Sequence, residues 1–152
     1  MNVRPARLRA GEWIDGAGAV LLIVFLFVPG WYSSKGGSAT TDGWHGLTHL
    51  RWLLLVTIIV ALALVWLQAT RRAPALPVTC SLFAMLLGGL TVLALLYRVV
   101  LDPPGGMSVE AGAYLGLLAT AVMTYGAYRS LRTEGIDTRD APGEIETVAL
   151  GS

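Results

Sequence analysis

The sequence predicts an all-α integral membrane protein, a four-helix up-down bundle with both termini in the cytoplasm. Two observations lead to this fold class. Apolar residues make up 55% of the 152 residues and charged residues only 14%, whereas about 25% of a typical soluble domain is charged. Four apolar stretches also approach the roughly 20 residues that a helix needs to cross a bilayer. These features argue against a soluble globule, a disordered chain and a nucleic-acid-binding protein.

We expect four membrane spans, at about residues 13–31, 50–67, 76–100 and 111–128. Each must be helical, because a backbone in lipid has no water to satisfy its amide groups. Runs such as residues 53–56, Leu-Leu-Leu-Val, do not show the alternation of a transmembrane β-strand. The membrane domain then covers residues 1–132. Residues 133–152 form a polar tail that we expect to be disordered and cytoplasmic.

The basic residues predict the direction of insertion. Of the eleven, eight lie on one side of the spans: Arg4, Arg7, Arg9, Arg71, Arg72, Arg129, Arg132 and Arg139. The other side has Lys35, Arg51 and Arg98. Because loops rich in Arg and Lys stay in the cytoplasm, we place both termini there and the protein in the cytoplasmic membrane, the inner membrane of a bacterium.

Aromatic residues lie near the predicted ends of the spans, where amphipathic rings prefer the membrane interface. We expect an inner belt of Trp13, Trp66, Tyr125 and Tyr128. We expect an outer belt of Trp31, Tyr32, Trp44, Trp52, Tyr97 and Tyr114. The outer loop at about residues 32–48 is rich in Gly, Ser and Thr, which predicts a flexible chain. The short loop at residues 68–77 predicts that spans 2 and 3 are antiparallel neighbours.

Small residues recur at four-residue spacing in spans 3 and 4. They are Ala84, Gly88, Gly112, Gly116, Thr120 and Thr124. In lipid, helices associate through close contact of such residues. We therefore predict that these faces join spans 3 and 4, and the alternative is that they join two subunits.

A candidate metal site precedes span 2. Asp42, His45 and His49 would share one helix face if the helix began near Asp42. Histidines at positions i and i+4 can bind a divalent metal, with Asp42 as a third ligand. No Glu follows the first His, as it does in a zinc protease motif. Two interfacial histidines held by hydrogen bonds are the simpler interpretation.

An outer charge cluster is expected from Arg51, Arg98, Asp102 and Glu110. Charges near a membrane are costly unless they are paired. We therefore expect Arg98 to pair with Asp102 or Glu110 and so to tie span 3 to span 4. The alternative is an anion or lipid-headgroup site formed by Arg51 and Arg98.

An inner charge cluster is expected at the start of span 1. Glu12 and Asp15 lie three residues apart on one helix face. We expect their partners among Arg71, Arg72 and Arg129. Acidic residues at this end of a helix are also favoured by the positive end of the helix dipole.

The middle of the spans carries the polar residues Thr57, Cys80, Thr91, Thr120 and Thr124, but no Asp, Glu, Lys, Arg or His. Proton-coupled carriers and voltage sensors generally need such groups within the bilayer, so a monomeric ion transporter is disfavoured. The chain has no nucleophile motif, phosphate-binding loop or dinucleotide fingerprint. We therefore expect no enzyme activity and no cofactor. The single cysteine excludes an internal disulfide.

Five blocks of sequence carry a resemblance: residues 11–13, 29–32, 69–77, 97–105 and 112–117, which begin Gly-Glu-Trp, Pro-Gly-Trp, Ala-Thr-Arg, Tyr-Arg-Val and Gly-Ala-Tyr. Over about residues 8–132 the chain resembles a group of small, uncharacterised four-span membrane proteins from high-GC bacteria. The resemblance implies a membrane location and four helices. It implies no activity, substrate or catalytic residue.

These observations lead to one expected function and two alternatives. We expect a non-enzymatic multi-pass membrane protein that acts as a homo-oligomer or as an accessory or scaffold subunit of a membrane complex. Its partners would be the lipid bilayer and other membrane subunits, and not nucleic acid. The first alternative is an oligomeric channel that conducts between subunits. The second is a metal-binding membrane protein or enzyme at the outer face.

Overall fold

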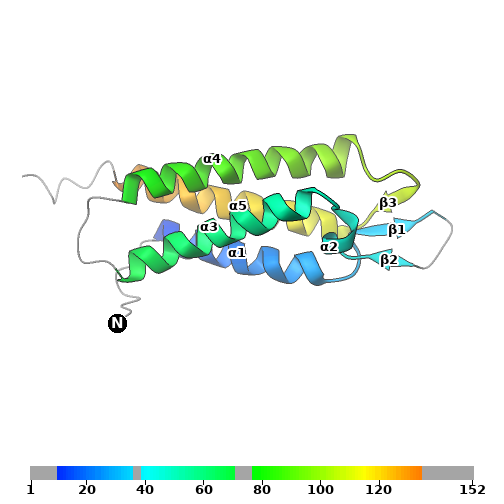
Figure 1. Cartoon of the computed structure of the whole chain (residues 1–152), viewed down its shortest axis with the longest axis horizontal. Helices are drawn as coiled ribbons and strands as arrows, with labels where there is room; N and C mark the ends of the chain where they lie inside the picture. The colour runs from blue at the N-terminus through cyan, green and yellow to red at the C-terminus, as the bar shows by residue number, and fades with distance from the viewer. Residues whose placement is uncertain (1–9, 36–38, 71–76, 135–152) are drawn as a thin grey trace, which may run out of the picture.

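A computed structural model describes residues 10–35, 39–70 and 77–134. The described chain is mostly helical, with four long helices side by side and a small antiparallel sheet at one end (Figure 1). The predictions for the polar tail from residue 135, for Arg71 and Arg72, and for the arginines before residue 10 lie outside the described residues.

The long helices follow the predicted spans closely. They are α1 (Ala10–Phe27), α3 (Leu50–Thr70), α4 (Pro77–Leu96) and α5 (Ala111–Glu134), and α4 continues into the π-helical segment η2 (Tyr97–Leu101). The first helix ends earlier than predicted because Pro29 and Gly30, which has a φ of 103°, turn the chain. The last helix continues past the predicted residue 128 to Glu134.

The contacts between the long helices form a closed ring. The helix α1 packs against α5 and α3, and α4 packs against the same two helices. The contact between α1 and α5 is the most extensive of the four. The start of α1 and the end of α5 lie at the same end of the molecule (Figure 1). The prediction that spans 2 and 3 are neighbours is confirmed.

The opposite end carries a small cap, made of the one-turn helix α2 (Gly43–Gly46) and three strands, β1 (Tyr32–Ser34), β2 (Thr40–Thr41) and β3 (Met107–Val109). The strand order is β2-β1-β3, and Tyr32 lies opposite both Thr41 and Val109. The prediction of a flexible first loop is therefore wrong for its described residues. The reason is that β3, which belongs to the loop between η2 and α5, forms backbone hydrogen bonds with β1.

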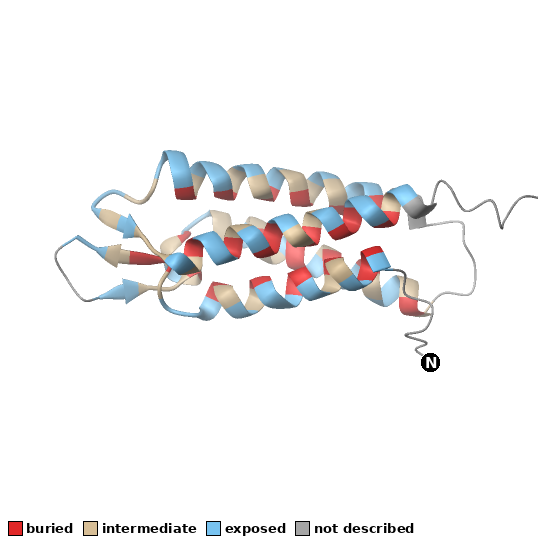
Figure 2. Cartoon of the chain, turned by 180° about the vertical axis from the view of Figure 1, so that it is seen from behind, coloured by how far each residue is buried: buried red, intermediate tan, exposed pale blue. Residues whose placement is uncertain are grey.

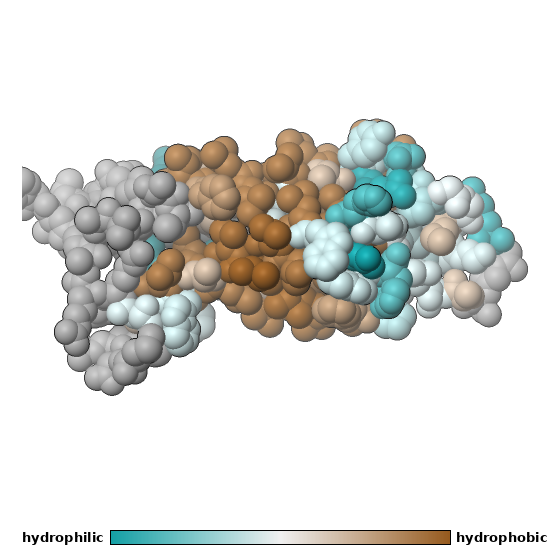
Figure 3. All heavy atoms as spheres, in the orientation of Figure 1, coloured by the Kyte–Doolittle hydropathy of each residue, from teal (hydrophilic) through white to brown (hydrophobic). Residues whose placement is uncertain are grey.

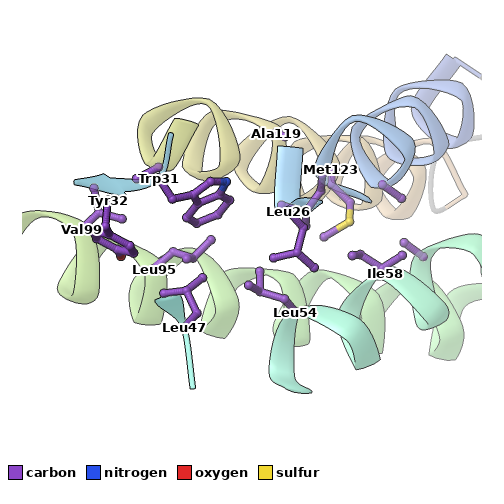
Figure 4. Packing of buried hydrophobic residues seen from close by; sticks show 14 residues of the cluster. Leu26, Trp31, Tyr32, Leu47, Leu54, Ile58, Leu95, Val99, Ala119 and Met123 are labelled. Atoms are coloured by element: carbon purple, nitrogen blue, oxygen red, sulfur yellow. The ribbon is translucent and has the colours of Figure 1, made fainter. Parts of the chain in front are cut away.

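The core combines side chains from all four long helices and from the cap. Leu26, Leu54, Leu95 and Met123 come from α1, α3, α4 and α5, and all four are at most 2% exposed. Figure 4 shows these side chains pointing toward one another. Buried residues lie on the sides of the helices that face inward (Figure 2).

Trp31 and Tyr32 belong to this core, since both are 0% exposed. Their assignment to the outer aromatic belt is therefore wrong. Because α1 ends early, the chain turns back over the ends of the helices. There, Trp31 Nε1 donates a hydrogen bond to the carbonyl of Phe25 at 2.6 Å. Other aromatic residues of the two predicted belts are exposed: Trp13, Trp52, Trp66, Tyr97, Tyr114, Tyr125 and Tyr128.

The outside of the long helices is apolar. Large exposed side chains include Leu21, Ile59, Phe83, Leu90 and Leu118, and hydrophobic residues form a wide band over the face shown in Figure 3, with hydrophilic residues gathered at the cap. Among the described residues, three helical segments are long and apolar enough to cross a membrane: Ala10–Phe27, Leu50–Thr70 and Ser81–Leu101. These features indicate a membrane protein. The helix α5 is less apolar because Gly, Thr and Tyr are frequent in it.

Candidate functional site

A pocket of about 560 Å³ lies at the cap end, where α3 begins and η2 extends α4. Its lining combines apolar and polar side chains: Leu47, Thr48, His49, Leu50, Ala94, Tyr97 and Arg98. It brings together two residues that the sequence analysis assigned to different sites, His49 and Arg98. We call it the interface pocket, because it lies where the apolar band meets the cap.

Two irregular turns shape the interface pocket. The helix α2 ends at Gly46, and Leu47 links it to α3 by donating its N–H to the Gly43 carbonyl and accepting from Arg51 N–H. Thr48 and His49 therefore form a turn before α3 begins. On the other wall, η2 ends with Asp102 N–H bonded to the Tyr97 carbonyl at 2.9 Å. Such π-helical turns often occur at functional sites.

Arg98 is the cation of the interface pocket. Its Nη1 donates to the Asp102 carboxylate at 3.0 Å and to the Asp102 carbonyl at 2.9 Å. The predicted pairing of Arg98 with Asp102 is confirmed. Because the two residues are four apart in one segment, however, the pair does not tie α4 to α5. Within the described chain, Arg98 Nε and Nη2 make no hydrogen bond.

Glu110 connects a different pair of elements from the one expected of Arg98. Its carboxylate accepts a hydrogen bond from Ser33 Oγ at 2.6 Å, and its backbone N–H donates to the Trp31 carbonyl at 2.9 Å. These bonds join β1 to the start of α5. The cap therefore connects the segment between α1 and α3 to the last helix.

Arg51 lies apart from the interface pocket. Its guanidinium carbon is 5.3 Å from the ring centre of Trp44 and 5.6 Å from that of Trp52. Cation–π contacts of this kind stabilise an arginine at an interface. Arg51 and Arg98 therefore do not form one anion site, and the four predicted outer charges divide into three local contacts.

Tyr32, in strand β1 of the cap, has a buried hydroxyl. This hydroxyl has no hydrogen-bond partner among the described residues. Burial raises the pKa of Tyr32, and the positive charge of Arg98 opposes part of this rise. Figure 4 shows the ring close to Val99 of η2. The hydroxyl is therefore neutral at physiological pH.

The candidate metal residues do not come together. Asp42 caps α2: its Oδ1 accepts from His45 N–H at 2.9 Å and lies 2.7 Å from His45 Nδ1. His49 stands beyond the break at Gly46, so the expected shared helix face is not formed. In residues 10–35, 39–70 and 77–134, no group of three His, Cys, Asp or Glu side chains could hold a metal ion. A helix cap explains the Asp42–His45 pair.

The two acidic residues of the predicted inner cluster are buried within the protein. Glu12 is 3% exposed and Asp15 is 1% exposed, and the backbone of Asp15 packs against Gly126 of α5. Neither Asp15 carboxylate oxygen has a hydrogen-bond partner among the described residues. Two serines, Ser81 and Ser130, are fully buried as well. The helix dipole alone does not account for acids that are covered in this way.

The small residues of the fourth span serve two different contacts. A Cβ on Gly88 would lie 2.6 Å from Thr124 Oγ1, which confirms the predicted contact between spans 3 and 4. In contrast, Gly112 and Gly116 face Gly30 and Trp31, not α4. Their assignment to the contact between spans 3 and 4 is wrong, because the large Trp31 ring needs the space that these glycines leave.

The closest helix contact, between α1 and α5, was not predicted from the sequence. A Cβ on Gly11 would lie 2.6 Å from Ser130 N, and one on Gly18 would lie 2.6 Å from Met123 N. Between them, Gly126 of α5 touches the backbone of Asp15. The spacing of Gly11, Asp15 and Gly18 on one face of α1 was the signal that could have revealed this contact.

A second hollow, the α4–α5 groove, runs along the outside of these two helices with a volume of about 790 Å³. It is lined by Met85, Leu86, Gly89, Leu90, Val92, Leu93, Ala121, Thr124, Tyr125 and Tyr128. A Cβ on Gly89 would meet no atom within 4 Å, so this glycine is not needed for packing inside the chain.

Comparisons of the chain with protein-family models, with curated proteins and with solved structures find no match.

Proposed function

We propose that this chain is a non-enzymatic integral membrane protein that crosses the bilayer four times and acts by association through the α4–α5 groove. The groove itself is the observation that supports this function. It is apolar, it lies on the outside of the long helices, and its small residues Gly89 and Ala121 alternate with large exposed leucines such as Leu90 and Leu93.

The other glycine-rich faces are already used within the chain. Met123 fills the space beside Gly18, and Trp31 fills the space beside Gly116. Thr124 fills the space beside Gly88. Because burying apolar side chains gains little in lipid, helices there associate where small residues allow a close approach. Gly89 offers such a place with nothing from its own chain opposite it.

We propose a second copy of this chain as the occupant. The groove carries both a notch, at Gly89, and ridges, at Leu86, Leu90 and Leu93. A surface that holds both shapes can pair with itself about a two-fold axis. A helix of another membrane subunit is the competing occupant, and the same test separates the two.

The channel alternative receives less support from the threonines. Thr57 and Thr91 share a hydrogen bond of 2.7 Å between α3 and α4, and Thr120 Oγ1 donates to the Gly116 carbonyl. All three are at most 2% exposed. They therefore face the interior of one chain and not a space between subunits.

Association is tested by comparing Gly89→Leu with Ala63→Leu. Ala63 is an exposed position on α3 outside the groove, so it is a matched control for an added leucine. We expect native mass spectrometry in mild detergent to give a dimer for the natural protein and for Ala63→Leu, and a monomer for Gly89→Leu. A monomer for all three proteins contradicts self-association, and recovery with an unlike membrane subunit identifies that subunit as the occupant.

The proposed topology places the cap outside the cell and both chain ends in the cytoplasm. The single cysteine allows a sharp test, because Cys80→Ser removes the only thiol. Ser108→Cys then marks the exposed strand β3, and Arg132→Cys marks the opposite end of α5. A membrane-impermeant maleimide applied to intact cells should label only the former. Labelling of both sites, or only of the latter, would refute this orientation.

A further inference from the structure

We propose that the interface pocket binds the phosphate of an anionic lipid headgroup, with the Arg98 guanidinium as the main ligand. This inference rests on the proposed membrane location but not on self-association. Arg98 meets the first requirement because Asp102 occupies only Nη1. The Nε–H and Nη2–H groups form the planar fork that matches two oxygens of a phosphate. The side chain is 34% exposed, so an external ligand can reach it.

The opposite wall supplies further donors. Thr48 and His49 are exposed, and their side chains make no hydrogen bond within the described chain. Their backbone N–H groups also donate to no described residue. These residues precede the 21-residue helix α3, whose positive dipole end favours an anion at this position. The wall therefore adds hydrogen-bond donors and a favourable dipole to the Arg98 cation.

Among the described residues, the lining of the interface pocket contains the Arg98 cation and no carboxylate. Arg98 is the charged residue in its lining, and the carboxylate nearest to it, Asp102, is 57% exposed and directed at Nη1. Asp102 therefore fixes the guanidinium while leaving its fork open. Arg51, which lies at the cap end of α3, makes cation–π contacts with Trp44 and Trp52 and is not part of the lining.

The apolar part of the lining selects a lipid over a soluble anion. Leu47, Leu50 and Ala94 cover one part of the pocket, and an inorganic phosphate would leave them without a partner. A headgroup phosphate at Arg98 would place its acyl chains along this apolar surface.

The test measures lipid retention by native mass spectrometry of the full chain in detergent. The probes are phosphatidylglycerol, which is anionic, phosphatidylcholine, which is zwitterionic, and inorganic phosphate. We expect the natural protein to retain one phosphatidylglycerol per chain and to prefer it about tenfold over phosphatidylcholine. Arg98→Gln should lose most of this preference, whereas the matched control Arg51→Gln should keep it.

Two further variants keep the test decisive if Arg98→Gln folds poorly. Arg98→Lys retains the charge without the fork and should show a partial loss, and Asp102→Asn frees Nη1 and should bind at least as well as the natural protein. Equal retention by the natural protein and both Arg98 variants overturns the proposal. Displacement of the lipid by millimolar inorganic phosphate would overturn the lipid source. Because Gly89→Leu leaves the pocket intact, unchanged retention by that monomeric variant separates this site from the proposed association.

Discussion

The indole ring of Trp31 lies directly against Gly116 of α5, at the place where any other residue would put a side chain. Trp31 is fully buried, and its Nε1 donates to the carbonyl of Phe25 near the end of α1. One side chain thus links the end of the first helix to the face of the last.

Gly116→Leu should therefore destabilise the protein. The added side chain has to displace the Trp31 ring, and overpacking of this kind typically costs about 1–3 kcal/mol. We expect a clear fall in the melting temperature in detergent. Ala63→Leu is the control, because Ala63 is an exposed position of α3 outside the α4–α5 groove. Equal melting temperatures for the natural protein and Gly116→Leu would show that Trp31 does not depend on this space.

The contact between α1 and α5 can be tested with two glycines in one helix. In Gly18→Ala the new Cβ would lie 2.6 Å from Met123 N, which belongs to the backbone and cannot move away easily. In Gly16→Ala the nearest atom is Val65 Cγ2 at 3.3 Å, at the end of a side chain. We expect Gly18→Ala to lower the unfolding free energy by about 2 kcal/mol and Gly16→Ala to change it by less than about 0.5 kcal/mol. Tryptophan fluorescence during titration with a denaturing detergent measures both.

Tyr32→Phe should stabilise the protein. The Tyr32 hydroxyl is buried and lacks a hydrogen-bond partner among the described residues, and such a group typically costs about 1–3 kcal/mol. Removal of the hydroxyl should raise the unfolding free energy by about 1 kcal/mol at pH 7. A fall on substitution would mean that the hydroxyl is bonded in the folded protein.

The same residue predicts a dependence on alkaline pH. Because burial raises the pKa of Tyr32 above its ordinary value of 10.0, the folded state holds the phenol proton more tightly than the unfolded state does. The resulting contribution to stability is fully present below pH 10 and is lost as the pH rises through the folded pKa. Tyr32→Phe should flatten the fall in melting temperature between pH 9 and pH 11, and an unchanged slope would contradict this origin.

The hydrogen bond between Thr57 and Thr91 should couple α3 to α4. Their hydroxyl oxygens are 2.7 Å apart, and each hydroxyl also lies 2.8 Å from the carbonyl four residues earlier in its own helix. A double-mutant cycle with Thr57→Val and Thr91→Val should give a coupling energy of about 0.6 kcal/mol, the average for such bonds in a membrane protein. Strict additivity of the two substitutions would show that the helices do not depend on this bond.

The four long helices could be predicted because each is a run of apolar residues that local composition reveals. Trp31 could not be placed in this way, since an aromatic residue near a span end has the same sequence signature at an interface and in a core. Its position follows from the early end of α1 and from Gly116, 85 residues further along the chain. The sheet was hidden for a similar reason, because the pairing of Tyr32 with Val109 uses backbone groups that every residue carries.

The candidate sites show the same limit. The pairing of Arg98 with Asp102 was predictable because both residues lie in one helical turn. The burial of Asp15 was not, because Gly126, which packs against the Asp15 backbone, belongs to another helix and is recognised only by the absence of a side chain. The interface pocket depends on the break between α2 and α3, which separates His49 from His45 and brings it to Arg98.

The order of strands in the cap has a consequence for biosynthesis. The central strand β1 is made early, but one of its two neighbours, β3, emerges from the ribosome only after α4 is complete. Until then β1 presents a row of unpaired amide groups, and an open strand edge of this kind invites pairing with other chains. A product that ended before β3 would keep this open strand edge.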